Sequence, residues 1–178
     1  GTQLGSYGFD IPKGSLSGLL ELLLTESKAE RLRVSSLQPQ EITHELLDLW
    51  NDPRLCPHFH MPLQSGCDDV LSRMRRRYTT AQYEEAADMV RSKVPGVTIT
   101  TDVIIGFPGE NEHQFRESIS FAKDIGFASM HVFPYSVRQG TSAVYMGPQV
   151  SERVKRNRMG EMLDLARRQS EAFRRGAI

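Results

Sequence analysis

The chain has 178 residues, of which 39% are hydrophobic and 25% are charged, and its 22 basic residues balance 22 acidic ones. This composition is ordinary for one globular domain, and a formal charge of zero gives no global field that would attract nucleic acid. Two cysteines without close spacing argue against a disulfide scaffold and favour a reducing, cytoplasmic compartment, and the sequence shows neither a signal peptide nor an apolar run of the roughly 20 residues that span a membrane.

Hydrophobic periodicity and turn residues predict helices that alternate with short strands. In the first half we expect a helix after the N-cap residue Ser15, a strand at 31–37, a helix at 41–50, a strand at 56–64, and helices at 67–76 and from 79 or 80 to about 92. In the second half we expect a strand from Thr98 to the turn at Gly106, a helix from 111 or 112 to Gly126, a strand at 129–135, a loop at 138–147 and a long polar helix after Ser151. This alternation predicts an α/β fold whose parallel strands form a barrel or an open sheet.

The strand that begins at Thr98 is the best candidate for the centre of a site. It runs into Gly106-Phe107-Pro108-Gly109, which must turn, and then into a helix. Ligands gather at the carboxyl ends of parallel strands, where this turn lies. Asp102 is a polar exception within the strand, and it is either a functional group or a satisfied core carboxylate.

A second candidate is the strand at 56–64, where Cys56, His58 and His60 share one face. Neighbours on one face lie about 7 Å apart, close enough for two histidines to bind one metal. A structural histidine is the commoner case, and the spacing fixes no third ligand.

Three ordered blocks resemble the radical S-adenosylmethionine (SAM) methylthiotransferase family. The family patterns are H-x-P-x-Q-S-G-x-D-x-V-L-x-x-M-x-R-x-Y, T-D-x-I-x-G-F-P-G-E-T and H-x-F-x-Y-S-x-R-x-G-T-x-A-x-x-M-x-x-Q-V. The matching stretches are 60–78, 101–110 and 131–150, and the opening residues 1–8 match a loop that precedes them. Blocks in this order and spacing cover nearly the whole chain and are far more specific than a lone glycine motif.

Within that family, residues 35–39 and 131–134 are most similar to the branch that acts on threonylcarbamoyladenosine next to the tRNA anticodon. Branches that act on isopentenyladenosine or on a ribosomal-protein aspartate stay as alternatives. The resemblance implies a parent enzyme that uses SAM and 4Fe–4S clusters to add a 2-methylthio group to a modified adenosine, with tRNA as its partner.

The sequence departs from the family in its cysteines. The family holds one cluster with C-x-x-x-C-x-x-C and another with three further cysteines, whereas Cys56 and Cys67 match neither motif, so we assign no metal ligand. Asn111 also replaces the usual threonine, and Cys67 replaces a common serine. We therefore expect residues 1–150 to form the later part of a radical SAM barrel with outer helices. We expect residues 151–178 to form a helix leading to an absent RNA-binding domain, and the chain alone to be inactive.

The resemblance implies that this chain supplies part of the SAM pocket at its strand ends. Gln3 lies where the family's loop faces the methionine end, Phe133 could pack near the adenine, and Arg138 could bind a carboxylate through two bonds. Each of these residues could instead serve a turn or the core. The full cofactor-binding set is Gln3, Ser35, Gln64, Ser65, Asp102, Gly106, Pro108, Gly109, Glu110, Phe133 and Arg138.

Two other classes of protein stay open. In a different α/β barrel enzyme, the glycine turn would hold a phosphate at a helix N-terminus, with Arg138 as the one basic strand-end candidate. In a binding module, the arginines at 73–77 and 153–175 would hold RNA, although the charge pattern alone favours solvated helix faces. Absent early strands would leave an unpaired sheet edge, so self-association is also expected.

Overall fold

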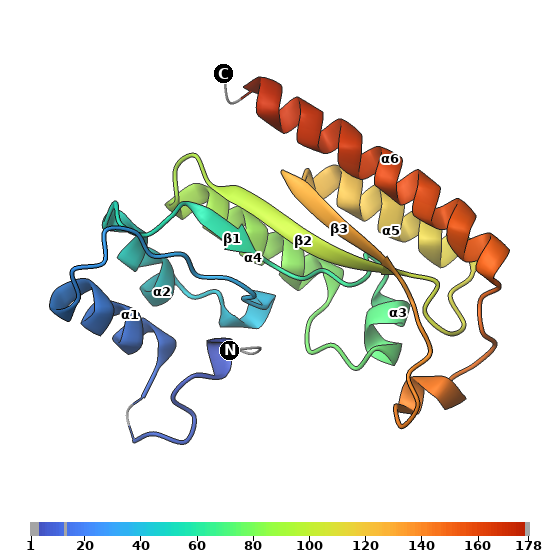
Figure 1. Ribbon diagram of the computed structural model, residues 1–178, viewed down its shortest axis with the longest axis horizontal. Helices are drawn as coiled ribbons and strands as arrows, with labels where there is room; N and C mark the ends of the chain where they lie inside the picture. The colour runs from blue at the N-terminus through green and yellow to red at the C-terminus, as the bar shows by residue number, and fades with distance from the viewer. Residues whose placement is uncertain (1–3, 13, 177–178) are drawn as a thin grey trace. The chain divides into compact units, whose positions relative to one another are not determined.

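The computed structural model describes residues 4–12 and 14–176, drawn in colour in Figure 1. The chain forms two compact units. The first unit comprises Gly1–Pro62 and Gln82–Thr100, and the second comprises Leu63–Ala81 and Thr101–Ile178. Among the described residues, none of the helices combines the length and apolar character that crossing a bilayer requires.

The first unit contains the early helices and one pair of strands. Its elements are η1 (Leu4–Ser6), α1 (Leu16–Glu26), η2 (Pro39–Glu41), α2 (His44–Asp48), η3 (Leu49–Asn51), β1 (His58–His60), most of α4 (Thr80–Lys93) and the start of β2 (Thr98–Ile105). Its core includes the ring of Phe59, which stacks on Trp50 with centroids 4.5 Å apart, and the buried Tyr83, whose hydroxyl donates to the Met61 carbonyl oxygen at 2.6 Å.

Side-chain caps determine where the early helices begin. Ser15 is the N-cap of α1, as predicted, and its Oγ accepts the N–H of Gly18 at 3.0 Å. The prediction of one helix over 41–50 is wrong, because the segment is divided into short elements. Thr43 accepts the N–H of Leu46 at 3.1 Å, so α2 starts only after that cap.

The predicted strand at 31–37 is also wrong. Leu32 forms only an isolated parallel bridge with Leu55. Ser36 has a φ of +61°, a left-handed conformation that interrupts any extended run. The predicted strand at 56–64 is shorter than expected for a similar reason, because Pro62 lacks an N–H and Gln64 has a φ of +66°. The paired residues of β1 and β2 are His58–Thr98, Phe59–Ile99 and His60–Thr100.

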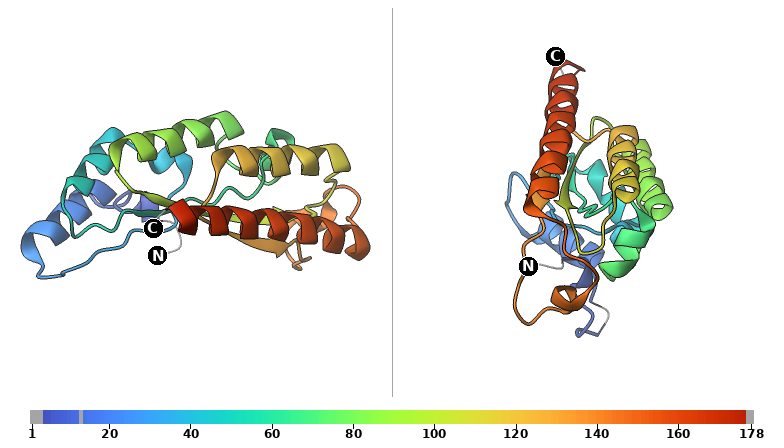
Figure 2. Two further views of the ribbon diagram at one scale, coloured as in Figure 1. Left: turned by 90° about the horizontal axis from the view of Figure 1, so that it is seen from above. Right: turned by 90° about the vertical axis from the view of Figure 1, so that its right-hand side faces the viewer.

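The second unit contains the better predicted half of the fold. Its elements are α3 (Asp68–Arg73), the rest of β2, α5 (Glu112–Ile125), β3 (Ser129–Pro134), η4 (Ser142–Tyr145) and α6 (Glu152–Gly176). The three strands are parallel and lie in the order β1-β2-β3. Within the second unit, α6 runs along β3 and contacts α5 (Figures 1 and 2). These observations confirm the α/β class with parallel strands.

Helix α5 is specified at both ends by its sequence. Asn111 accepts the N–H of Gln114 at 2.9 Å, and Gln114 Oε1 accepts the N–H of Asn111 at 3.1 Å, which completes a capping box. Gly126 ends the helix with a φ of +70°, as its position predicted. Phe115, on the inner face, is fully buried.

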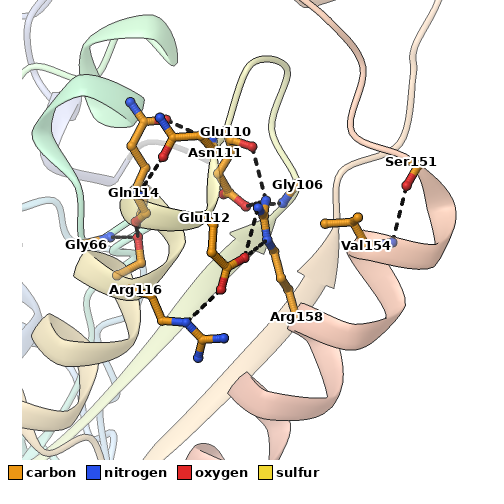
Figure 3. Close-up of polar contacts among 12 residues, drawn as sticks. Gly66, Gly106, Glu110, Asn111, Glu112, Gln114, Arg116, Ser151, Val154 and Arg158 are labelled. Atoms are coloured by element: carbon orange, nitrogen blue, oxygen red, sulfur yellow. Dashed lines mark hydrogen bonds and ion pairs between the residues drawn. The ribbon is translucent and has the colours of Figure 1, made fainter.

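A buried ion pair joins the turn after β2 to α6 (Figure 3). Arg158 Nη1 lies 2.8 Å from Glu110 Oε1, and the two side chains are only 6% and 2% exposed. The same nitrogen also donates to the Glu110 carbonyl oxygen at 3.1 Å. Burial raises the pKa of Glu110, while the N–H of Gly106 and the Arg158 guanidinium oppose that shift.

We predict that Glu110→Ala destabilises the chain by about 3 kcal/mol, because it removes the buried carboxylate partner of Arg158 and leaves only the exposed Glu112 carboxylate, 3.3 Å from Nη2. The free energy of unfolding in urea measures this loss. The control is Glu161→Ala, which removes a half-exposed carboxylate that binds Arg116 and should cost far less. Equal losses from the two variants would contradict the importance of the buried pair.

Candidate cofactor-binding site

A cleft of about 490 Å³ opens in the second unit beside β2 and β3. Its volume lies within the range of about 300–1,000 Å³ that is typical of small-molecule sites. Four of the residues predicted from the sequence line it, namely Gln64, Asp102, Phe133 and Arg138. The other lining residues are Ile104, Pro134, Tyr135, Ser136, Thr141 and Ala143.

Gln64 is held in the cleft wall by its backbone. Its N–H donates to the Asp102 carbonyl oxygen at 2.8 Å, and its own carbonyl oxygen accepts the N–H of Ile104 at 2.9 Å. These two bonds to β2 keep a non-glycine residue at a φ of +66°. Such strained backbone persists where the surroundings impose it, and it is frequent at ligand sites. The side-chain amide that it positions can both donate and accept hydrogen bonds.

Asp102 combines the two interpretations that the sequence left open. It lies on the half-buried face of β2, its side chain is 27% exposed, and its Oδ1 is 3.2 Å from Nδ1 of His131 on β3. Asp102 is therefore paired and also accessible from the cleft. Two residues beyond His131, Phe133 is 50% exposed, and the two rings meet edge to face with centroids 6.5 Å apart. An exposed aromatic face of this kind can stack on a nucleobase.

The far wall of the cleft is the segment after β3. Arg138 is exposed, and its carbonyl oxygen accepts both the N–H and the Oγ1–H of Thr141, which fixes the loop behind it. The ring of Tyr135 packs edge to face on Phe107, with centroids 5.4 Å apart. The Tyr135 hydroxyl is buried and has no hydrogen-bond partner within the described residues. A polar group of a bound ligand would satisfy it.

The Gly106–Glu110 turn supports the cleft from outside its lining. The N–H of Gly106 donates to Glu110 Oε1 at 3.1 Å, and the N–H of Gly109 donates to the Pro148 carbonyl oxygen at 2.9 Å. The N–H of Glu110 donates to the Phe107 carbonyl oxygen, also at 2.9 Å. Pro108 is buried. Because these three N–H groups are bonded within the protein, they are not free to bind a phosphate.

The remaining predicted residues lie elsewhere. Ser65 is buried, its Oγ is 3.1 Å from the Oγ of Ser118, and it accepts the N–H of Cys67 at 3.3 Å. Ser35 belongs to the first unit, where it is exposed. Gln3 falls outside the described residues.

The histidines of β1 are engaged by neighbouring side chains in the first unit. Arg33 places Nε 3.2 Å from His58 Nδ1 and Nη2 2.8 Å from His58 Nε2. Burial and the Arg33 charge lower the pKa of His58. Nδ1 of His60 lies 3.0 Å from Thr100 Oγ1, and Cys56 Sγ accepts a hydrogen bond from Arg31. Both ring nitrogens of His58 therefore face the Arg33 guanidinium, which a metal would have to displace.

The cysteines do not fit an iron–sulfur cluster. Such clusters are held mainly by thiolates, usually four of them, and this sequence contains only Cys56 and Cys67. Both are buried, and burial together with a hydrogen bond donated by the Cys67 thiol to the Glu117 carboxylate raises the pKa of Cys67 to about 11. Its thiol therefore stays protonated at neutral pH in the metal-free chain.

Sequence reasoning missed the two buried cations of α6. Besides Arg158, Lys155 is buried, and its Nζ donates to the Tyr135 carbonyl oxygen at 3.1 Å in the cleft wall. The available signal was helical spacing, because both residues share a face with Met162 and Leu165.

We predict that Gly106→Ala destabilises the chain more than Gly126→Ala. Both glycines have positive φ, +75° and +70°, so both variants carry backbone strain of about 1–2 kcal/mol. Only at Gly106 would a Cβ lie 2.3 Å from Lys155 Cγ, while nothing lies within 4 Å at Gly126. Thermal and urea unfolding of both variants test this, and equal losses would show that Lys155 moves aside freely.

Comparison with known proteins finds tRNA-modifying relatives. The Bacillus subtilis protein named threonylcarbamoyladenosine tRNA methylthiotransferase MtaB is 39% identical over 93% of this chain and 37% of its own length. The Aquifex aeolicus protein of the same name is 39% identical over 97% of this chain and 42% of its own length. The Natranaerobius thermophilus tRNA-2-methylthio-N(6)-dimethylallyladenosine synthase is 35% identical over 96% of this chain and 38% of its own length. The chain thus spans about two fifths of the length of these relatives.

Solved structures share the fold at low sequence identity. Coproporphyrinogen III oxidase HemN from Escherichia coli, described as a radical SAM enzyme, has a TM-score of 0.69 at 17% identity over 86% of this chain and 36% of that chain. The radical SAM methyltransferase TsrM from Kitasatospora setae has a TM-score of 0.58 at 16% identity, over 75% of this chain and 26% of that chain. The family model of the Radical SAM superfamily matches residues 15–122, which is more than half of the sequence. By this match, the chain belongs to the radical SAM superfamily.

Proposed function

We propose that the chain is part of a methylthiotransferase that modifies an adenosine of tRNA, and that its cleft holds SAM. The relatives named above carry that activity in their names, and the cleft gathers the residue types that SAM requires. The observation that carries the proposal is the grouping of Gln64, Asp102, Phe133 and Arg138 around one cleft in a radical SAM fold.

Each of these side chains matches one part of SAM. The exposed ring of Phe133 suits the adenine, and the Asp102 carboxylate can accept hydrogen bonds from ribose hydroxyls. Arg138 can bind the methionine carboxylate through a charge-assisted pair, and the Gln64 amide can serve either polar group. When bound beside a reduced 4Fe–4S cluster, SAM supplies the radical chemistry. The described residues bind and orient SAM in this proposal, and they offer no cluster ligands.

The branch of the family is a finer part of the proposal. Relatives named for threonylcarbamoyladenosine and for dimethylallyladenosine have overlapping identities, 36–40% and 34–37%. Residues 35–39 and 131–134 favour threonylcarbamoyladenosine, and dimethylallyladenosine is the alternative. A phosphate-dependent barrel enzyme is disfavoured, because the N–H groups of the glycine turn are bonded internally.

We predict that Arg138→Ala weakens SAM binding by about tenfold or more, because it removes a charge-assisted pair worth about 1.5–3 kcal/mol. Titration calorimetry or ligand-observed NMR on the purified chain measures the affinity. Arg75→Ala is the matched control, because Arg75 is another exposed arginine of the second unit and does not line the cleft. If both variants bind SAM equally, Arg138 has no role in the cleft.

We also predict that the 178-residue chain alone does not transfer a methylthio group, because its two cysteines cannot hold a 4Fe–4S cluster. The assay incubates the chain anaerobically with iron, sulfide, SAM, a reductant and tRNA, and analyses the nucleosides by mass spectrometry. A full-length relative serves as the positive control. Methylthiolated adenosine made by the chain would overturn this prediction.

A further inference from the structure

Helix α6 has more basic residues than carboxylates to pair with them. Between residues 152 and 176 the sequence has eight basic and four acidic residues. Two of the basic residues, Lys155 and Arg158, are buried and bonded within the second unit. The six other basic residues are exposed arginines.

Every carboxylate of α6 is already engaged in an ion pair. Asp164 binds Arg167 at 3.1 Å, and Glu171 binds Arg175 at 3.5 Å. The other two carboxylates, Glu152 and Glu161, bind Lys155 and Arg116. Four exposed arginines therefore have no carboxylate partner within the described residues, namely Arg153, Arg156, Arg168 and Arg174.

These four arginines, called here the α6 arginine face, lie opposite the buried side of the helix. At 100° per residue, Arg153, Arg156 and Arg174 fall on the arc that faces away from Met162 and Leu165, which pack inward, and Arg168 lies at the edge of that arc. With a rise of 1.5 Å per residue, the face extends about 30 Å along the helix. Figure 2 shows that α6 is covered along only one side by the other elements of the second unit.

We propose that the α6 arginine face binds the phosphate backbone of RNA. A guanidinium binds phosphate through two parallel hydrogen bonds and is weakly hydrated, which suits it to a charged polymer. Protein partners need a central cluster of apolar or aromatic anchors, whereas Leu163 is the one large apolar side chain on this arc of the described helix. The choice of RNA over another polyanion rests on the proposed function.

The test measures the binding of a fluorescent anticodon stem–loop RNA to the 178-residue chain over a range of salt concentrations. Four phosphate contacts predict a slope of log K against log salt of about −3. The double variant Arg153→Ala/Arg156→Ala should make that slope shallower by about 2, or about 1 for each arginine. Replacing the same two residues with lysine should preserve most of the slope, because lysine still binds phosphate as a point charge.

The matched control is Arg75→Ala/Arg77→Ala, which removes two exposed arginines of the second unit outside α6 and changes the net charge equally. Equal losses from the two doubles, or no RNA binding by the wild-type chain, would overturn the assignment to α6. Tighter binding of a polyglutamate peptide than of RNA would overturn it too.

SAM affinity, measured on the same variants, separates this inference from the proposed function. If the α6 double variant loses RNA binding and keeps its SAM affinity, the result supports the α6 arginine face. RNA binding through α6 without any SAM binding would support the face and count against the SAM cleft.

Discussion

The second unit depends on the buried pair between Glu110 and Arg158. Glu110 Oε1 accepts the N–H of Gly106 and so closes the turn after β2. The same oxygen binds Arg158 Nη1, which attaches α6 to this turn. Two ions can be buried at such a site because each satisfies the other and the adjoining backbone, and because Glu112 Oε2 also lies 3.3 Å from the Arg158 guanidinium. One contact thus fixes the turn, and it holds α6 at the start of its course beside β3.

That arrangement explains how a cleft is built by residues that do not line it. Lys155, three residues before Arg158, donates to the carbonyl oxygen of Tyr135 and passes directly over Gly106. The segment after β3 is also tied to β2 by the bond from the Tyr135 N–H to the Ile105 carbonyl oxygen at 2.8 Å. The cleft wall is therefore braced from both sides, and its polar groups are positioned before any ligand arrives, which reduces the entropy lost on binding.

The sequence predicted the fold best where local signals act alone. Helix α5 has its capping box and its terminal glycine, and β2 has alternating β-branched residues, so both were found nearly to the residue. The strand at 31–37 failed because a serine adopts positive φ only through its surroundings, and no local pattern announces Ser36. Part of the lining of the candidate cleft was anticipated. Gln64, Asp102, Phe133 and Arg138 share a cleft, whereas the burial of Lys155 and Arg158 depends on packing that a polar helical sequence conceals.

Cys67 has a consequence for the chemistry around this protein. With a pKa of about 11, only about one Cys67 thiol in ten thousand is ionised at pH 7. Thiolates, not thiols, capture iron and attack persulfides and oxidants. A cysteine with so little thiolate is chemically silent toward these reagents. The packing of Cys67 against Val70 and Phe107 keeps the thiol unreactive while its sulfur atom still fills space in the core.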